Sequence, residues 1–189
     1  MLDLALNRGS LAVKITVKTT LSVLLVVLAV ALPQMTHAIG GAQAGTIYMP
    51  MYLPALLAGV LLGWKWGLAV GLLSPVASYA FTTLTMSTAM PNLTRLPYMI
   101  LEIGTYGLVS GLFSRRVEKA PYLAFPAVLS AQLAGRAVYL IYNLIAGRDF
   151  MSLWSGICTG MVGLWLQAII VPVVAIILCK VIKDEQKTE

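Results

Sequence analysis

One apolar segment of the chain carries a stripe of polar side chains. Four residues recur at intervals of four, three and four positions, which places them on one face of an α-helix: Gln132, Arg136, Tyr139 and Asn143. Such side chains are costly against lipid, so this face is predicted to point at other helices or a wet cavity. Glu102 lies on the preceding apolar segment, and an ion pair with Arg136 would lower the cost of burying either charge. The pair predicts a structural contact that fixes helix register, a binding site for a polar ligand, or both.

A second group of candidate residues lies nearer the N-terminus. The stretch 48–54 reads Tyr-Met-Pro-Met-Tyr-Leu-Pro, and helix breaks at prolines within a membrane tend to line cavities. Its methionines and tyrosines suit a flat, partly apolar ligand through sulfur–aromatic and stacking contacts. His37 and Gln43 precede this stretch, although a histidine in a loop is more often incidental than a ligand. The candidate contacts from this region are therefore His37, Gln43, Tyr48 and Met49.

The composition excludes a water-soluble globule. Of the 189 residues, 59% are hydrophobic and 11% are charged, whereas soluble domains carry roughly 25% charged residues. Apolar runs of about 18 residues or more mark membrane-spanning helices, and the chain is predicted to be one all-α integral membrane domain over residues 1–189. A small, polar segment at 37–45 is predicted to be a loop. The six predicted spans lie at about 11–33, 47–63, 67–83, 98–113, 122–146 and 153–179.

The basic residues predict the topology. With both termini in the cytoplasm, ten of the 13 Lys and Arg residues fall in inner segments, Arg136 falls within a span, and Arg95 and Arg148 fall in outer segments. This bias follows the positive-inside rule, and it explains the net charge of +6 without a nucleic-acid partner. The first apolar run follows basic residues and also fits a secretory signal, but this topology requires it as a span.

Glycines recur at every fourth position across the second and third spans. Gly59, Gly63, Gly67 and Gly71 would form small-residue faces that let helices approach closely. The series crosses the predicted turn at 64–66, which favours two pairs on consecutive helices over one continuous ridge. The faces predict internal helix packing or a sliding surface for a membrane partner, which makes Gly59 and Gly63 candidate partner contacts.

The sequence also lacks several signatures of catalysis. It contains no GxxxxGK[ST] nucleotide loop, no HExxH and no GxSxG motif, so the chain is predicted to be no enzyme and to hold no metal or cofactor. Glu102 is the single acid evident within the spans, whereas proton relays use chains of ionisable groups. A self-powered, proton-coupled transporter is therefore disfavoured.

Taken together, four stretches resemble the substrate-binding S component of an energy-coupling factor (ECF) transporter, an ABC-type importer. They lie at 48–59, 63–67, 71–75 and 102–112, and the resemblance extends to length, six-helix layout and glycine spacing. It implies a multi-pass protein of a prokaryotic plasma membrane that binds a vitamin or related micronutrient at its external side. The resemblance also implies a transmembrane coupling subunit and two cytoplasmic ATPase subunits as partners, with delivery by toppling in the bilayer.

The resemblance leaves the docking residues and the substrate open. The first helix of the family often carries AxxxA, whereas this chain has Ala29 and Ala31 spaced AxA, with Ser22 about two turns before Ala29. These three are the candidate docking residues. Candidate ligands are cobalamin, a pyridoxine or hydroxymethylpyrimidine type compound and a queuosine precursor, with the small residues at 40–45 leaving room for the largest. An autonomous small-solute transporter or channel is the alternative, and an intramembrane enzyme would need a nucleophile or metal cluster that the sequence lacks.

Overall fold

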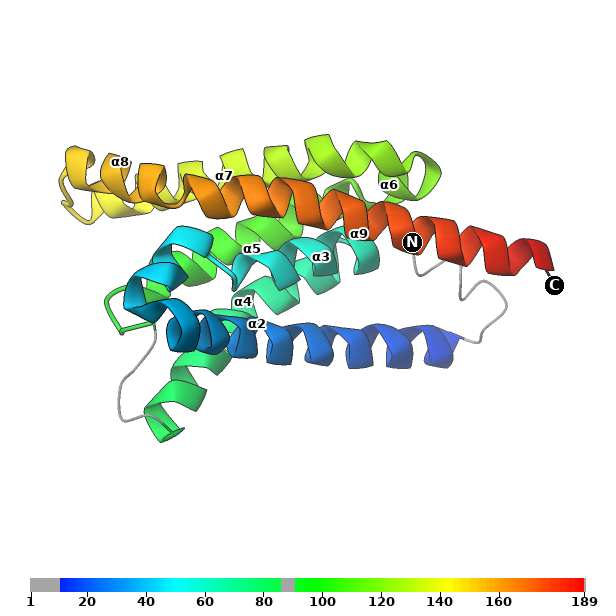
Figure 1. The fold of residues 1–189 in the computed structure, drawn as a ribbon, viewed down its shortest axis with the longest axis horizontal. Helices are drawn as coiled ribbons and strands as arrows, with labels where there is room; N and C mark the ends of the chain where they lie inside the picture. Colours follow the sequence, from blue (N-terminus) through cyan, green and yellow to red (C-terminus); the bar gives the residue numbers. More distant parts are fainter. Residues whose placement is uncertain (1–10, 86–90, 189) are drawn as a thin grey trace.

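The computed structural model describes residues 11–85 and 91–188, and every regular element in that part of the chain is helical (Figure 1). The predicted all-α class is therefore confirmed. The elements are α2 (Leu11–Tyr48), α3 (Tyr52–Leu62), α4 (Trp64–Thr85), α5 (Leu96–Leu112), α6 (Ser114–Lys119), the 3-10 turn η1 (Pro121–Leu123), α7 (Ala124–Ile145), α8 (Phe150–Thr159) and α9 (Met161–Thr188).

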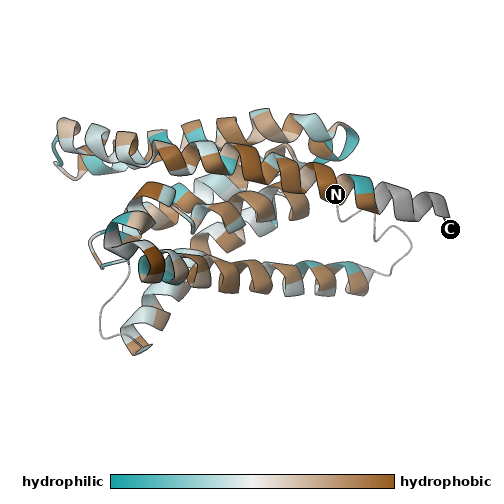
Figure 2. Cartoon of the chain, in the orientation of Figure 1, coloured by the Kyte–Doolittle hydropathy of each residue, from teal (hydrophilic) through white to brown (hydrophobic). Residues whose placement is uncertain are grey.

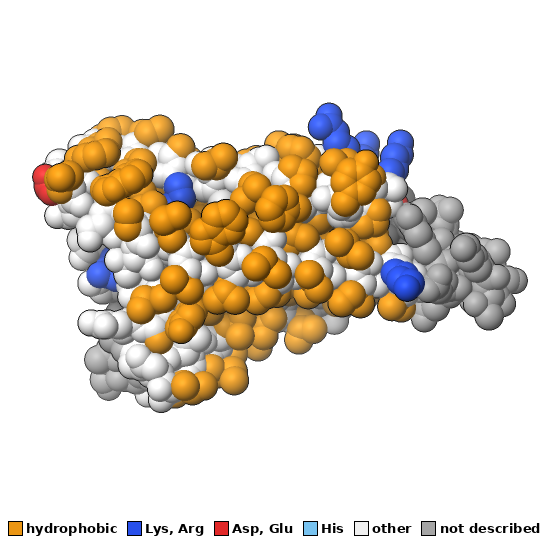
Figure 3. All heavy atoms as spheres, turned by 45° about the horizontal axis from the view of Figure 1, so that its top comes forward, with side chains coloured by type: hydrophobic (Ala, Val, Ile, Leu, Met, Phe, Trp, Pro, Cys, Tyr) orange, Lys and Arg blue, Asp and Glu red, His pale blue; other side chains and the backbone are white. Residues whose placement is uncertain are grey.

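Apolar side chains cover the flanks of the bundle, as expected for a protein surrounded by lipid. Figure 2 shows hydrophobic residues along the outer helices, and Figure 3 shows them spread over one flank with charged side chains mostly toward the ends. Leu84 and Ile145 are 85% and 83% exposed. Five helical stretches in the described residues are long and apolar enough to cross a membrane: Ala12–Gly41, Gln43–Leu62, Trp64–Thr85, Pro121–Ile145 and Met161–Val181. The chain thus has the character of a multi-pass membrane protein.

The predicted loop at 37–45 is helical, and the prediction that the first helix ends near residue 33 is wrong. Helix α2 continues through Pro33 to Tyr48 and bends at Gly41, whose φ of 68° and ψ of −174° suit glycine. In an apolar environment a backbone stays helical because its N–H and C=O groups have no water to bind. A small, polar composition therefore produces a kink here rather than a loop.

The predicted proline break is present between α2 and α3. Helix α2 ends at Tyr48 and α3 begins at Tyr52, and Met49 has a φ of 46°, which is uncommon for a residue other than glycine. The Nε2 of Gln167 on α9 donates a hydrogen bond to the Met49 carbonyl over 3.0 Å. The turn at 49–51 is thereby fixed to the last helix.

The last predicted span, 153–179, is divided in two at Gly160, between α8 and α9. A Cβ at Gly160 would overlap the terminal methyl group of Met49, which occupies the space beside the break. Gly163 lies one turn further on, where a Cβ would be 2.5 Å from the Tyr48 carbonyl oxygen. The two helix interruptions, at 49–51 and at Gly160, therefore fit against each other.

Helices α3, α4 and α5 pack through their glycines. A Cβ at Gly67 would lie 2.6 Å from the Cα of Gly59, and a Cβ at Gly107 would overlap the carbonyl of Gly67. Gly63, with a φ of 98°, turns the chain from α3 directly into α4. The prediction of glycine pairs on consecutive helices is confirmed in part. Gly59 on α3 and Gly67 and Gly71 on α4 pack inside the chain, whereas Gly63 forms the turn itself and the predicted turn at 64–66 belongs to α4.

The two ends of the bundle differ in composition. Helix α2 begins and α9 ends at the same end, close to α6 (Figure 1). The kinked part of α2 and helix α8 lie at the opposite end, where several polar residues line a cavity of about 600 Å³.

Candidate functional site

The predicted ion pair between α5 and α7 is present. The Nη1 of Arg136 lies 2.9 Å from Oε1 of Glu102, and the side chains are 11% and 1% exposed. The Oη of Tyr52, at the start of α3, donates a hydrogen bond to Oε2 of Glu102 over 2.8 Å. Both carboxylate oxygens are thus in contact with a donor, which offsets much of the cost of burying the charge.

The pair forms part of the wall of a cavity of about 600 Å³ between α3, α5, α7 and α8. Its lining is polar at several points and contains three arginines. The lining residues are Gly45, Thr46, Met49, Tyr52, Arg95, Tyr98, Met99, Glu102, Arg136, Tyr139, Arg148, Asp149, Ser152, Leu153, Gly156 and Thr159.

Aromatic rings and guanidinium groups alternate along this cavity. The rings of Tyr98 and Tyr139 meet edge to face, with centroids 5.3 Å apart. The Cζ of Arg148 lies 5.4 Å from the Tyr98 ring centroid, and that of Arg136 lies 5.7 Å from the Tyr139 ring centroid. Such cation–π contacts hold the two guanidinium groups in place without using their N–H donors.

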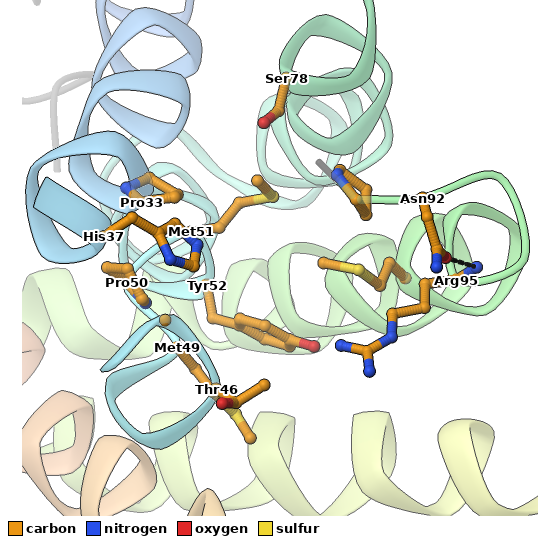
Figure 4. Close-up of a pocket in the computed structure, with 13 residues that line it drawn as sticks. Pro33, His37, Thr46, Met49, Pro50, Met51, Tyr52, Ser78, Asn92 and Arg95 are labelled. Carbon is orange, nitrogen blue, oxygen red and sulfur yellow. Dashed lines mark hydrogen bonds between the residues drawn. The ribbon is translucent and has the colours of Figure 1, made fainter. Parts of the chain in front are cut away.

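A second cavity of about 300 Å³ adjoins the first and shares Met49, Tyr52 and Arg95 with it (Figure 4). In Figure 4, Arg95 extends from the start of α5 toward Tyr52, and His37 lies near Met51 on the other side. The residues that line this cavity alone are Pro33, His37, Pro50, Met51, Ser78, Pro91 and Asn92. The smaller cavity is mostly apolar, so the two together offer a polar and an apolar compartment.

The Met49 side chain contacts the ion pair and lines both cavities. One Nη2 hydrogen of Arg136 points at the Met49 sulfur, which is a weak acceptor. The Nε of Arg136 is buried without a hydrogen-bond partner among the described residues. Arg136 therefore retains donor capacity that a stronger acceptor on a ligand could use.

Of the other predicted substrate contacts, some reach the cavities and some do not. Tyr139 lines the larger cavity and His37 the smaller one, where the Nδ1 of His37 lies 3.2 Å from the Gly41 carbonyl oxygen. Asn143 is fully buried but lines neither cavity, and its Nδ2 donates to the Tyr139 carbonyl over 2.8 Å. Gln43 and Tyr48 are exposed outside both cavities.

The predicted docking residues are also unequally accessible. Ala29 is 0% exposed and packs in the core, and Gly59 is enclosed by α4 and α5, so neither presents a free surface. Ser22 is 7% exposed. Ala31 lines an apolar groove between α2 and α4, and Gly63 lies in the turn between α3 and α4.

The lining of the larger cavity includes residues that are not among the predicted site residues, of which Arg95, Tyr98 and Arg148 bring charges or an aromatic ring to it. Tyr52 lies in the stretch 48–54, whose tyrosines are expected beside a ligand. A signal for two of these residues exists in the sequence. Arg95 and Arg148 are the two basic residues that the predicted topology places outside, against the positive-inside tendency. An exception of this kind indicates a specific role for the charge.

No protein-family model, curated protein sequence or solved structure matches this chain.

Proposed function

We propose that this chain is a substrate-binding membrane protein, the S component of an ECF-type importer, which captures a vitamin-like solute on the outer side. The observation that carries the proposal is the Glu102–Arg136 ion pair, buried in the wall of a cavity of about 600 Å³ inside a helical membrane bundle. Buried charges within a membrane protein are costly, and they commonly mark a ligand or ion pathway.

The size and lining of the two cavities support a small, partly aromatic ligand. Ligand sites are typically about 300–1,000 Å³ with apolar walls and a few convergent polar groups. The cavities of about 600 and 300 Å³ fall in this range, and the rings of Tyr98 and Tyr139 provide surfaces for a planar group. Among the candidate ligands, this volume favours a pyridoxine- or hydroxymethylpyrimidine-sized compound, or a queuosine precursor, over cobalamin, which is the largest.

The arrangement of the helices supports six crossings with both termini inside. Helix α2 begins and α9 ends at one end of the bundle (Figure 1), which requires an even number of crossings. Helix α5 supplies the sixth, because its 17 residues rise about 26 Å, close to the roughly 30 Å hydrocarbon core. The basic residues of α6 lie at the end shared by the termini, which by the positive-inside rule is cytoplasmic.

The contacts of the Glu102 carboxylate support a protein that obtains its energy from partner subunits. Both of its oxygens contact a donor, so the carboxylate is ill suited to pass protons along a relay. An external ATPase module, joined through a coupling subunit, would then supply the energy for delivery by toppling. An autonomous transporter or channel remains the competing function.

Two substitutions test the binding site. The full chain is purified in detergent, and native mass spectrometry identifies the co-purified small molecule and any partner subunits. With that compound in calorimetry, Glu102→Gln and Arg136→Ala should each weaken binding by about tenfold or more, since a hydrogen bond to a charged group contributes about 1.5–3 kcal/mol. Glu118→Gln, in α6 at the opposite end, is the matched control and should bind as the unaltered protein does. Unchanged affinity in both site variants would remove the pair from the binding site.

A second measurement separates the two functions. Liposomes that contain this chain alone should bind solute without accumulating it. Accumulation against a gradient in such liposomes would favour the autonomous transporter.

A further inference from the structure

The larger cavity carries an excess of positive charge. Arg95, Arg136 and Arg148 line it together with Glu102 and Asp149. Arg136 is neutralised by Glu102 at 2.9 Å. Asp149 is therefore the remaining acid of the lining that could neutralise the charge of Arg95 or Arg148.

Asp149 is engaged elsewhere. Its carboxylate caps the N-terminus of α8, where Oδ2 accepts hydrogen bonds from the Ser152 backbone N–H at 2.9 Å and from the Ser152 hydroxyl at 3.2 Å. Among the described residues, neither Arg95 nor Arg148 forms an ion pair. The cavity thus holds two guanidinium groups with no carboxylate partner in that part of the chain.

The chain segments that carry these two arginines lie side by side, although they belong to different elements, and both side chains line the same cavity. Arg95 directly precedes α5, and Arg148 lies between α7 and α8. The Nη2 of Arg148 donates to the carbonyl of Thr94 over 3.5 Å, and Thr94 is the neighbour of Arg95 in the chain. Arg95 is exposed and Arg148 is half-buried, so together they form the mouth of the cavity.

The topology gives this pairing further weight. Basic residues are depleted from outer segments of membrane proteins, and Arg95 and Arg148 are the two that the proposed topology places there. Both line one cavity instead of spreading over the outer surface. Like charges in one cavity repel each other, so an anion bound to both arginines would offset that repulsion.

We propose that the solute carries an oxyanion, a carboxylate or a phosphate, that binds between Arg95 and Arg148 at the cavity mouth. The planar guanidinium fork matches both groups in geometry and charge. Tyr98 and Tyr139 line the neighbouring wall of the cavity. We therefore expect the solute to be a planar ring that packs against these tyrosines and carries the oxyanion as a substituent. This assignment names the substrate class of the site and rests on the proposed function.

The assignment is tested with three matched ring compounds: benzoate, phenyl phosphate and neutral benzamide. Binding of each to the purified full chain is measured in a neutral detergent by ligand-detected NMR titration. Benzoate or phenyl phosphate should bind at least about tenfold more tightly than benzamide, as expected for charge-assisted hydrogen bonds. Whichever of the two anions binds more tightly identifies the oxyanion.

Paired variants locate the effect. Arg95→Gln with Arg148→Gln should abolish the preference for the anion, whereas Arg115→Gln with Arg116→Gln, two exposed arginines at the opposite end, should retain it. Equal binding of benzoate, phenyl phosphate and benzamide, no binding of either anion, or a preference that survives in the first pair would overturn the assignment. Displacement of the anion by added phosphatidylglycerol would likewise overturn it, because the arginines would then bind a lipid headgroup.

Failure of the oxyanion assignment and failure of the proposed binding function give different results. A neutral co-purified solute whose binding is lost in Glu102→Gln would overturn the oxyanion and leave the binding function standing. Anion binding at the mouth, combined with unchanged affinity for the co-purified solute in the Glu102 and Arg136 variants, would contradict the proposed binding site for that solute.

Discussion

The two ends of this bundle are built in different ways. At the cavity end, the helices are interrupted three times, at Gly41, at 49–51 and at Gly160. At the opposite, basic end, α3 passes into α4 through Gly63 alone, and Lys18, Lys65 and Arg115 surround a hollow of about 450 Å³. Irregular backbone is tolerated at membrane depth where it lines a cavity, so the interruptions agree with the position of the proposed binding site.

The charges at the two ends differ as well. At the cavity end, Arg136 is held by Glu102 and by ring contacts. At the basic end, Arg115, Arg116 and Lys119 are exposed side chains. Charges that are buried and paired respond strongly to the loss of a partner, whereas exposed charges contribute little to stability. The following substitutions test this difference.

The largest effect on stability is expected from the glycine contacts between α4 and α5, which lie between the two ends of the bundle. Gly107→Val should reduce the free energy of unfolding by about 3 kcal/mol or more, because its side chain would overlap the backbone of α4. Thermal unfolding of the detergent-purified protein measures this loss. In Gly156→Ala the new methyl group would meet the Tyr139 hydroxyl at 3.5 Å, an ordinary contact, so its melting temperature should be unchanged. Equal stability of the two variants would contradict the close packing.

The next effect concerns the ion pair. Arg136→Met leaves Glu102 buried without its cation, and it should cost about 3–5 kcal/mol. The double variant Glu102→Leu with Arg136→Met removes both charges and should recover much of that loss. Unfolding by denaturant compares the two. A double variant no more stable than the single one would show that the stranded charge is not the cause.

A smaller effect is expected at the break after α2. Gln167→Leu removes the hydrogen bond to the Met49 carbonyl, which should cost about 1 kcal/mol and accelerate amide hydrogen exchange around residues 49–52. The matched control is Gln132→Leu, which removes a 2.8 Å hydrogen bond from α7 to the Leu164 carbonyl. It should have a similar cost without a change in exchange at 49–52. Equal exchange in both variants would argue against a specific role for Gln167.

The smallest effect is expected at the basic end. Lys65 is exposed, and its Nζ lies 5.5 Å from the Trp64 ring centroid. Lys65→Gln should change the free energy of unfolding by no more than about 0.5 kcal/mol and leave solute affinity unaltered. Calorimetry with the co-purified solute checks the second point, and a large loss of affinity would show that the two ends are coupled.

Helical periodicity predicted the centre of the site well. The stripe on α7 does face other helices: Gln132 reaches α9 and Arg136 reaches α5. The prediction succeeded because a polar side chain in a membrane-spanning segment is stable only against other helices or in a wet cavity. The spacing of such residues then determines which of them share a helix face. Five of the six predicted spans overlap helical stretches that are long and apolar enough to cross a membrane, for the same reason.

The positions of Arg95 and Arg148 at the cavity mouth, and of the helix breaks, depend on contacts between residues that are far apart in the sequence. These features could not be predicted from local patterns. Arg95 and Arg148 meet because the start of α5 lies beside the connection between α7 and α8, where Arg148 contacts the Thr94 carbonyl. Gly160 interrupts the last span where the Met49 side chain occupies the neighbouring space. No local pattern in 153–179 contains that information, since the partner lies more than a hundred residues earlier.

The one-residue connection at Gly63 constrains how the cavity can change shape. With no linker between α3 and α4, and with backbone contacts from Gly59 and Gly107 to Gly67, three helices have no room to slide or rotate past one another. They form a stiff wall on one side of the cavity. If the cavity binds a solute as proposed, its entry and exit would depend on movement of the opposite side, where α8 and the part of α2 beyond Gly41 are joined to the rest through breaks in the helices.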